Sequence, residues 1–361
     1  MRRALIIHSP HSGKSAQLEQ AITYLRENHV EVVDVISIAT LDGLTDQGPR
    51  WKEQGIDIAV AAGGDGLVGG VITHIAECGL PLGILPLGTS NDVARSLGIP
   101  QELHAAARVI ADGQLTEVDI GVAKPAQQAP HLASAQHGKP VAVQVGKQRH
   151  GFFAHALTVG LNVEFARLAT NVATRQRYGR MTYPFAAFEV LRNHEASEME
   201  LNFFGLSILP KVGTEHQSTP TLLTEPVTLK SRALQVTVIN APIFGGMWQL
   251  AVPKATLNDG LLDIIVIEDI DHESLNTIVT RFFSRAEHRP EAPQEWHAQY
   301  PDLHPAELTG IPGIHHVQAR EVTISTHIDP QDVTLDGEVR GQTPVYAQMA
   351  DEKLLVAAPG R

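Results

Sequence analysis

Two glycine-rich turns, each directly after a short apolar run, constrain the fold of this chain more than any other feature. The first is Gly63-Gly64-Asp65-Gly66, which follows Ile56–Val60, and the second is Pro86–Arg95, which follows Leu82–Leu85. Each turn stands where a buried strand should end and a helix should begin. This order is typical of an α/β fold, in which ligands bind at the carboxyl ends of parallel strands.

The rest of residues 1–121 repeats the same alternation of strand and helix. Strands separated by single helices predict right-handed crossovers and a parallel sheet. The predicted strands are Ala4–His8, Val30–Ile36, Ile56–Ala61, Leu82–Pro86 and Glu117–Gly121. The predicted helices are Ser15–Asn28, Leu67–Cys78 and Glu102–Asp112.

The pattern changes after Gly121, where β-type alternation becomes dominant. The predicted strands are Phe152–Gly160, Glu198–Ile208, Ala233–Ile239, Leu262–Ile267, Glu321–Thr326 and Gln331–Leu335. Helical stretches are expected at Glu164–His194 and Ser274–Ser284, and Leu354–Ala358 is expected to return to the first domain. The predicted insertions, rich in Pro, His or polar residues, lie near 123–149, 209–230 and 286–313.

The predicted fold class is therefore α/β with two domains and a cleft between them. An N-terminal parallel-sheet nucleotide-binding domain covers residues 1–121, plus about 345–361. A larger, β-rich, sandwich-like domain covers residues 122–344. A chain of 361 residues is long enough for two such cores.

Charge and composition exclude several classes of protein. The net charge of −12 argues against a general nucleic-acid binder, and no apolar stretch reaches membrane-spanning length. The apolar run after Met1 is too short for a signal peptide, and the single cysteine, Cys78, rules out an intrachain disulfide framework. We therefore expect a cytoplasmic protein without a transmembrane segment, while monomer and homodimer both stay open.

Both glycine-rich turns carry residues that suit phosphate chemistry. Glycines let backbone N–H groups approach phosphate oxygens, and an Asp in each turn can face a cation. In the second turn, Thr89 and Asn91 can donate to phosphate or sugar oxygens, Asp92 can organise a cation, and Arg95 can clamp an acidic group. The alternative is a pair of tight, N-capped helix starts with a solvated Arg95.

A third turn, Ser9–Ser15, resembles a P-loop only partly. The Walker A spacing needs a glycine where His8 stands, so that motif fails. A looser nucleotide contact and a merely solvated Lys14 are equally compatible with this sequence.

Two Asp-Gly turns in the second half have both a structural and a functional interpretation. Asp259-Gly260 predicts a hairpin turn, and its carboxylate with free carbonyls could bind a hard cation. Asp336-Gly337 predicts another turn, after which Glu338 could act as a general base. The histidines, including His315-His316, lack metal-ligand spacing and are interpreted as solvated loop residues.

Taken in order, these segments resemble the diacylglycerol kinase catalytic family, which includes bacterial lipid kinases and sphingosine kinases. The most specific part is Pro86–Arg95, since related kinase families share the first turn only. The other matching segments, in chain order, are Ser12–Lys14, Gly63–Gly66, Val118–Gly121, Gly179 with Tyr183, Asn240 with Gly245-Gly246, Pro253–Asp263 and Asp336–Glu338.

The resemblance implies an ATP- and Mg²⁺-dependent kinase of a lipid hydroxyl, acting as a peripheral protein at a membrane surface. Glu338 would be the general base, and Asp65 would be catalytic with Asp92 and Asp119 in a carboxylate network around Mg²⁺. A structural Mg²⁺ would be held by the carbonyls of Thr256 and Leu261 with the Asp259 side chain. The residues implied to bind the nucleotide are Ser12, Gly63, Gly64, Gly66, Gly88, Thr89, Asn91, Asp92 and Arg95.

The sequence also departs from the family pattern on the nucleotide side. Leu67 replaces the usual Thr, and Gly69-Gly70 replace a frequent Asn-Glu pair. Each helical Gly costs about 1 kcal/mol of helix propensity. Two alternatives therefore stay open: a kinase of a soluble acceptor, similar to NAD kinases, and a weak or inactive nucleotide- or lipid-binding protein.

Overall fold

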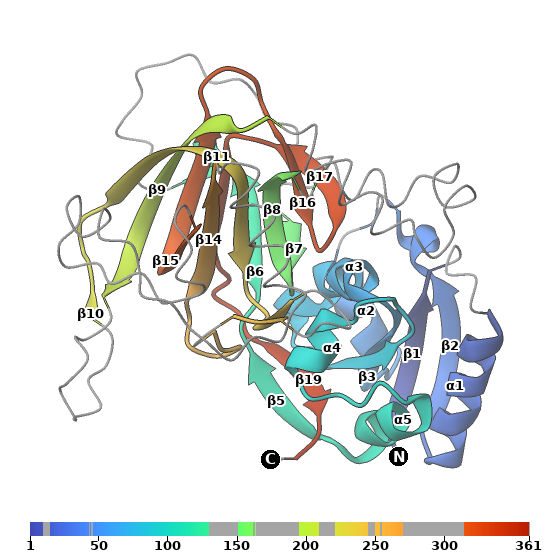
Figure 1. Ribbon diagram of the computed structural model, residues 1–361. Helices are drawn as coiled ribbons and strands as arrows, with labels where there is room; N and C mark the ends of the chain where they lie inside the picture. The colour runs from blue at the N-terminus through green and yellow to red at the C-terminus, as the bar shows by residue number, and fades with distance from the viewer. Residues whose placement is uncertain are drawn as a thin grey trace.

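The structure is a computed structural model that describes residues 1–9, 15–42, 44, 46–129, 151–161, 163, 195–208, 221–244, 250–252, 255–269 and 314–360. A smaller α/β part and a larger β-rich part lie side by side (Figure 1). The predicted fold class is confirmed. The predicted helices at Glu164–His194 and Ser274–Ser284 lie outside the described residues.

The smaller part contains a six-stranded sheet of order β2-β1-β3-β4-β19-β5. Its strands are β1 (Arg3–His8), β2 (Glu31–Ser37), β3 (Ile58–Gly63), β4 (Leu82–Pro86), β5 (Gln114–Val118) and β19 (Leu354–Ala358). All neighbours run parallel except β19 and β5. The C-terminal strand β19 thus lies in the first sheet, while β18 (Val345–Met349) lies in the second.

Helices cover this sheet. They are α1 (Ser15–Glu27), α2 (Gly48–Glu53), α3 (Asp65–Ile75), α4 (Asp92–Ser96) and α5 (Leu103–Asp112). Short 3₁₀ turns lie at η1 (Ile38–Leu41), η2 (Ala76–Cys78) and η3 (Ala126–Gln128). Helix α1 packs on α5, whereas α3 packs on β3 and also contacts the second sheet. Helix α3 therefore contacts both parts of the molecule.

The larger part is an antiparallel sheet whose main path is β17-β16-β8-β11-β14-β15-β18-β6-β7, with β9 and β10 beside it. Besides β18, its strands are β6 (Gly121–Pro125), β7 (Gly151–Phe153), β8 (Ala156–Gly160), β9 (Ser197–Ile208), β10 (Thr221–Leu222), β11 (Val227–Ile239), β14 (Leu262–Glu268), β15 (Ile314–Thr326), β16 (Asp332–Leu335) and β17 (Glu338–Gln342). A separate small pair is formed by β12 (Ile243–Phe244) and β13 (Leu250–Ala251).

Strand β7 connects the two hydrophobic cores. Phe152 packs in the core of the smaller part, and Phe153 packs in the core of the larger part. Adjacent residues of a strand point to opposite faces, so one short strand can serve both cores. The two parts are thus joined by buried apolar contacts as well as by the chain itself.

Two predicted strands are each interrupted in the structure. Glu117–Gly121 divides between β5 and β6 at Asp119, whose buried carboxylate binds Lys353 and the Gly260 amide. Phe152–Gly160 divides between β7 and β8 at Ala154 and His155, whose amides donate to Asp336. Distant side chains therefore cause both interruptions.

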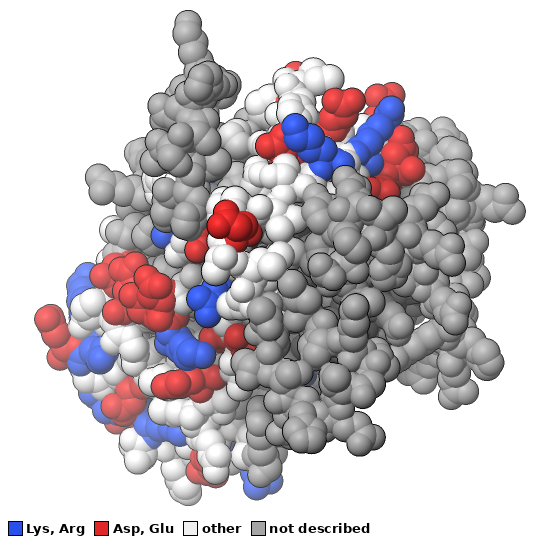
Figure 2. Space-filling view, turned by 90° about the vertical axis from the view of Figure 1, so that its left-hand side faces the viewer, with Lys and Arg blue, Asp and Glu red and all other residues white. Residues whose placement is uncertain are grey.

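The described surface carries mixed charge. Figure 2 shows Lys and Arg side chains interspersed with Asp and Glu over the described atoms of one face. None of the helices within the described ranges combines the length and the apolar character that a membrane span requires.

Candidate functional site

The two glycine-rich turns lie against each other because β3 and β4 are parallel neighbours. Gly63 pairs with Pro86 at the carboxyl end of the sheet, and the Leu87 amide donates to the Gly63 carbonyl at 3.1 Å. A β-carbon placed on Gly88 would lie 2.4 Å from the Cα of Gly64. Only glycine allows this approach, and its consequence is a single compact loop pair at the sheet edge.

Helix α3 begins at this loop pair without a side-chain cap. Gly64 is its N-cap residue and makes no side-chain hydrogen bond to the first turn. The first amides of a helix have no partner within it, so they and the helix dipole can bind an anion. The start of α3 therefore fits a phosphate group.

Asp65 and Asp92 bring negative charge to the same place. Asp65 Oδ1 accepts a hydrogen bond from the Val93 amide at 2.9 Å, which ties α3 to the start of α4. Asp92 is buried, and its Oδ2 lies 3.6 Å from His155 Nε2. A phosphate can approach two carboxylates only if a cation is present, so this pair fits a metal-bound nucleotide.

Asn91 and Arg95 serve mainly to build the second turn. Asn91 adopts a left-handed backbone with φ of 53°. Its Oδ1 accepts from the Gly88 amide at 2.9 Å, and its Nδ2 donates to the Pro86 and Gly88 carbonyls and to Gln101 Oε1. Arg95 Nε donates to the Ser90 carbonyl at 2.9 Å.

Thr89 is exposed and open to a ligand, whereas Ser12 lies outside the described residues.

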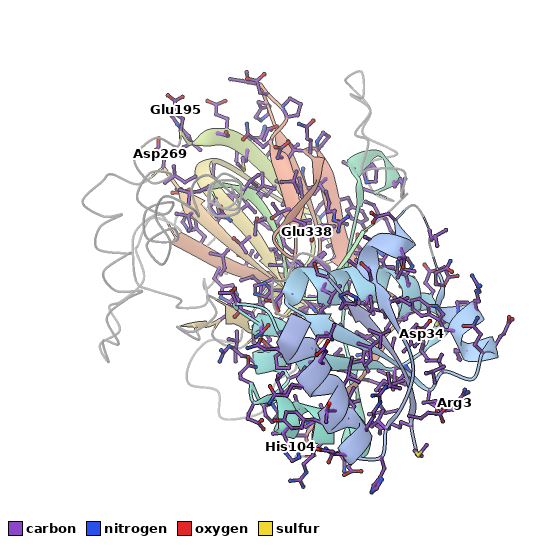
Figure 3. All side chains as sticks on the ribbon, turned by 90° about the vertical axis from the view of Figure 1, so that its right-hand side faces the viewer. Arg3, Asp34, His104, Glu195, Asp269 and Glu338 are labelled. Atoms are coloured by element: carbon purple, nitrogen blue, oxygen red, sulfur yellow. The ribbon has the colours of Figure 1, made fainter. Side chains whose placement is uncertain are left out.

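Glu338 reaches the loop pair from the other part of the molecule. Asp336 and Gly337 both have positive φ, 49° and 86°, and form the tight turn between β16 and β17. Glu338 follows this turn, where the β-rich part meets the α/β part (Figure 3). A β-carbon on Gly66 would lie 3.2 Å from Glu338 Oε1, so this carboxylate is next to the first turn of α3.

Arg340 is the immediate partner of the Glu338 carboxylate. Its Nη2 donates to Glu338 Oε2, and both side chains are about half exposed. Residues two apart on a strand share a face, which explains the pairing. The site thus combines amides and carboxylates on one side with an accessible, oriented carboxylate on the other.

Asp336 is a buried carboxylate that the sequence predicted only as part of a turn. Its oxygens accept from the amides of Ala154, His155 and Ala156 at 2.9–3.0 Å. Burial raises the pKa of Asp336 to about 6, against the opposing effects of the nearby His155 and of these amides. His155, between Asp92 and Asp336, was not predicted either, because its role depends on residues far away in sequence.

The loop at Thr256–Leu261 forms a second group of acidic residues. Burial raises the pKa of Asp259, and the nearby Asp263 and Asp119 raise it further against the hydrogen bonds from Leu261 and Thr256. Asp119 Oδ1 accepts a hydrogen bond from Lys353 Nζ, and its Oδ2 accepts one from the Gly260 amide, both at 2.7 Å. Crowded carboxylates of this kind fit a cation.

This loop would need backbone oxygens to hold a cation. Across the described part of the chain, no three His, Cys, Asp or Glu side chains converge in a way that could hold a metal ion. The sequence predicted a hairpin turn here, and that prediction is wrong. The strands on either side of the loop do not pair with each other, because β13 pairs with β12 and β14 pairs with β11 and β15. Gly260 does adopt a left-handed turn, with φ of 70°.

The prediction that His315 and His316 are solvated loop residues is wrong. Both are buried in β15. His316 Nε2 lies 2.6 Å from Asp263 Oδ1, and His315 Nε2 lies 3.2 Å from Glu268 Oε1. The adjacent strand β14 supplies both partners, so each histidine pairs through its Nε2 within the sheet, while the buried Nδ1 of His316 makes no hydrogen bond with the described residues.

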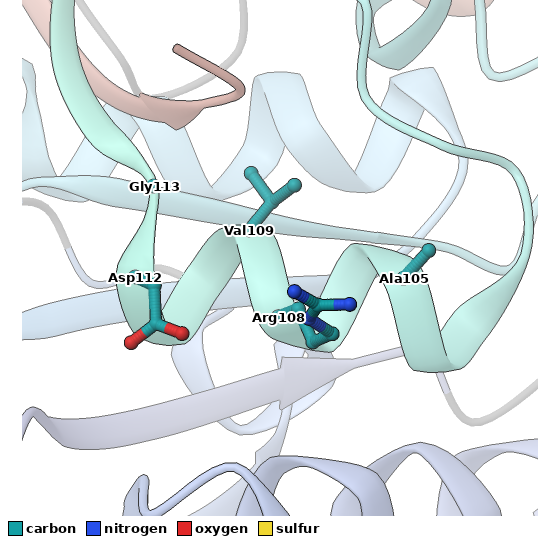
Figure 4. A pocket seen from close by; sticks show the side chains of 5 residues that line it. All are labelled: Ala105, Arg108, Val109, Asp112 and Gly113. Atoms are coloured by element: carbon teal, nitrogen blue, oxygen red, sulfur yellow. The ribbon is translucent and has the colours of Figure 1, made fainter.

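A hollow of about 290 Å³ lies along α5 (Figure 4). It is lined by Ala105, Arg108, Val109, Asp112 and Gly113. None of these residues belongs to the groups described above, and the hollow opens widely to solvent. We therefore assign it no part in the site.

Two known domain families match successive parts of this chain. Residues 3–123 match the diacylglycerol kinase catalytic domain. Residues 156–289 match a domain described as the YegS C-terminal NAD kinase beta sandwich-like domain. The first match contains both glycine-rich turns and Asp119.

Relatives and solved structures cover nearly the whole chain. Diacylglycerol kinase of Staphylococcus saprophyticus is 26% identical over 348 residues, covering 95% of this chain and 91% of the relative. That of Staphylococcus aureus strain Newman is 26% identical over 367 residues, covering 99% and 93%. The crystal structure of a diacylglycerol kinase from Bacillus anthracis has a TM-score of 0.55 at 17% identity, covering 99% of this chain and 97% of that one. A second crystal structure from that organism has a TM-score of 0.61 at 18% identity with the same coverage.

Proposed function

We propose that this chain, which belongs to the diacylglycerol kinase catalytic-domain family, transfers the γ-phosphoryl group of ATP to the hydroxyl of a diacylglycerol-like lipid. The observation that carries the proposal is the placement of Glu338 beside Gly66, at the uncapped start of α3. An accessible carboxylate there is next to the place where a phosphate would bind.

In the proposed reaction, Glu338 takes the proton of the lipid hydroxyl as its oxygen attacks the γ-phosphorus. The bond between the γ-phosphorus and the β–γ bridging oxygen breaks, and ADP leaves with that oxygen. A hydroxyl is a poor nucleophile at neutral pH, so a positioned base accelerates the step. Arg340 holds one Glu338 oxygen and thereby orients the carboxylate.

On the nucleotide side, the amides at the start of α3 and the turn at Gly88 would hold the phosphates. Thr89 is exposed and would donate to them, while Asn91 and Arg95 keep the turn in shape. Asp65 and Asp92 would hold a divalent cation, proposed as Mg²⁺. When bound, such a cation neutralises charge on the transferred phosphoryl group.

At the second acidic group, Thr256, Asp259 and Leu261 would hold a structural Mg²⁺. Asp119 would act there by fixing the amide of Gly260, because Lys353 and that amide already occupy its two oxygens. A lipid acceptor implies a transient, peripheral association with a membrane surface. The absence of a spanning helix among the described residues is compatible with it.

The test is transfer of radiolabelled phosphate from ATP to diacylglycerol in mixed micelles. We expect labelled lipid with the parent protein and a loss of about 10²- to 10⁴-fold in kcat with Glu338→Gln, the range typical of a missing general base. The matched control is Glu117→Gln, on the exposed face of the edge strand β5, which should keep full activity.

A kinase of a soluble acceptor is the second candidate, favoured by the description of the family that matches residues 156–289. The same assay with NAD⁺ in place of the lipid separates the two. Label in NAD⁺ but not in lipid would replace the proposed acceptor. ATP binding without transfer to either acceptor would favour an inactive nucleotide-binding protein.

A further inference from the structure

We infer that Asp336 is a positioning residue that sets the location of Glu338 over α3, and that Gly69 makes room for it. This inference rests on the proposed function, in which Glu338 is the base. Asp336 itself is buried in this turn. It acts through Glu338, two residues further along the chain.

The orientation of the Asp336 carboxylate is fixed by several bonds at once. Oδ2 accepts from the Ala154 amide at 3.0 Å, and Oδ1 accepts from the amides of His155 and Ala156 at 2.9 and 3.0 Å. The Asp336 amide in turn donates to the Ala156 carbonyl at 2.9 Å. The turn that carries Glu338 is therefore anchored to the segment between β7 and β8.

That segment is itself anchored by Asn240, which is buried. Its Nδ2 donates to the Ala154 carbonyl at 3.0 Å and to the Asp119 carbonyl at 2.8 Å. Its amide donates to the His155 carbonyl at 2.9 Å. The support of Asp336 thus continues to the junction between the two parts of the molecule, where movement would change the distance from Glu338 to α3.

Two glycines of α3 receive the turn. Gly66 and Gly69 are three apart and share one face of the helix. A β-carbon on Gly66 would lie 3.4 Å from the Asp336 carbonyl oxygen, and one on Gly69 would lie 2.4 Å from Asp336 Oδ2. A side chain at position 69 would therefore displace the carboxylate or the whole turn.

The neighbouring Gly70 has no such neighbour. A β-carbon there would meet Ile38 Cδ1 at 3.5 Å, which is ordinary van der Waals contact. The two adjacent glycines, which both weaken α3 by propensity, thus differ sharply in what they face. Gly69 serves the Asp336 turn, so its presence is compatible with an active enzyme.

The experiment measures steady-state lipid phosphorylation by the full chain with Gly69→Ala and Gly70→Ala. We expect Gly69→Ala to lower kcat by about 10- to 100-fold, as a displacement near 1 Å of a reacting group can do, with the KM for ATP nearly unchanged. Gly70→Ala is the matched control and should keep the parent kcat. Thermal unfolding of both variants shows whether each one folds.

The decisive arm repeats Gly69→Ala in a Glu338→Gln background. If Gly69 acts by keeping Glu338 in place, the second substitution should lower the residual kcat by less than about twofold, since the base is already missing. Asp336→Asn, which keeps the side-chain volume, should lower kcat when introduced into the parent protein. In the Glu338→Gln background it should likewise change the residual kcat by less than about twofold. It provides a second variant if Gly69→Ala does not fold.

The inference is overturned if Gly69→Ala is as active as the parent, or if it lowers kcat equally with and without Glu338. A general loss of structure would give the latter result. If the parent labels no lipid at all, the proposed function fails and the inference fails with it. That outcome is distinct, because the two others are measured in an active parent protein.

Discussion

Asp65 Oδ1 accepts a hydrogen bond of 2.9 Å from the amide of Val93, and this bond joins the two glycine-rich turns. One oxygen of a carboxylate that opens α3 thus caps the start of α4. The same side chain is proposed to hold a divalent cation. Asp65 therefore has a structural role and a proposed chemical role that can be separated by substitution.

Asp65→Asn should separate them, because the amide oxygen of Asn can still accept from Val93 while its negative charge is lost. We expect the free energy of unfolding to stay within about 0.5 kcal/mol of the parent value and kcat to fall at least about 100-fold. Asp65→Ala should lose activity and also about 1 kcal/mol of stability. Denaturant unfolding and phosphate transfer measure the two effects, and equal stability losses for both variants would contradict the capping role.

Gly88→Ala tests the close contact between the turns. Its β-carbon would lie 2.4 Å from the Gly64 Cα, and backbone on both sides must move to relieve this overlap. We expect a loss of about 1–3 kcal/mol in the free energy of unfolding, as for other overpacked sites, together with weaker ATP binding by calorimetry. Gly70→Ala is again the control, and parent-like ATP affinity in Gly88→Ala would show that the contact is dispensable.

The strands that were predicted best are those whose pattern is purely local. Leu82–Pro86 and Leu354–Ala358 have the predicted bounds, because each is a short apolar run between turn residues. By contrast, the interruptions at Asp119 and at Ala154 depend on Lys353 and Asp336, more than 180 residues away in sequence. No window of local sequence contains that information.

The sequence predicted which residues make up most of the candidate site, but it did not predict the role of each residue within it. The spacing of glycines and aspartates indicated the turns. It did not reveal that the side-chain amide of Asn91 forms its hydrogen bond within the loop itself, or that Gly69 faces a carboxylate. His315 and His316 were misjudged because their partners lie on β14. A left-handed Asn and a glycine inside a helix were the available signals, and both have several causes.

Lys353→Met should lower the stability of the protein, because it removes the cation that pairs with Asp119 in a group of neighbouring carboxylates. Without the ammonium group, Asp119 remains buried near Asp259. We expect about 1–3 kcal/mol lower stability, less than for a fully buried pair because Lys353 is half exposed. Added Mg²⁺ should restore part of this loss if the loop binds a cation. Lys230→Met, which removes a more exposed pair with Glu200 than that of Lys353 with Asp119, is the control and should change little with or without Mg²⁺.

Asp336 should make the stability of the protein fall as pH rises through weakly acidic values. Burial raises its folded-state pKa to about 6, whereas an unfolded chain has a value near 3.9. Between these values the folded protein keeps a proton that the unfolded chain has lost. The contribution is therefore complete below about pH 4 and lost above about pH 6, a difference of about 3 kcal/mol.

Asp336→Asn removes this titration, so the slope of unfolding free energy against pH between about 4 and 6 should become less negative than in the parent. Urea unfolding at half-unit pH steps measures it, with Glu117→Gln as a control that should reproduce the parent slope. An unchanged slope in Asp336→Asn would mean that the carboxylate is ionised across this range. The three amides that it accepts from would then outweigh its burial, and the Asp336 turn would be held by a charged anchor.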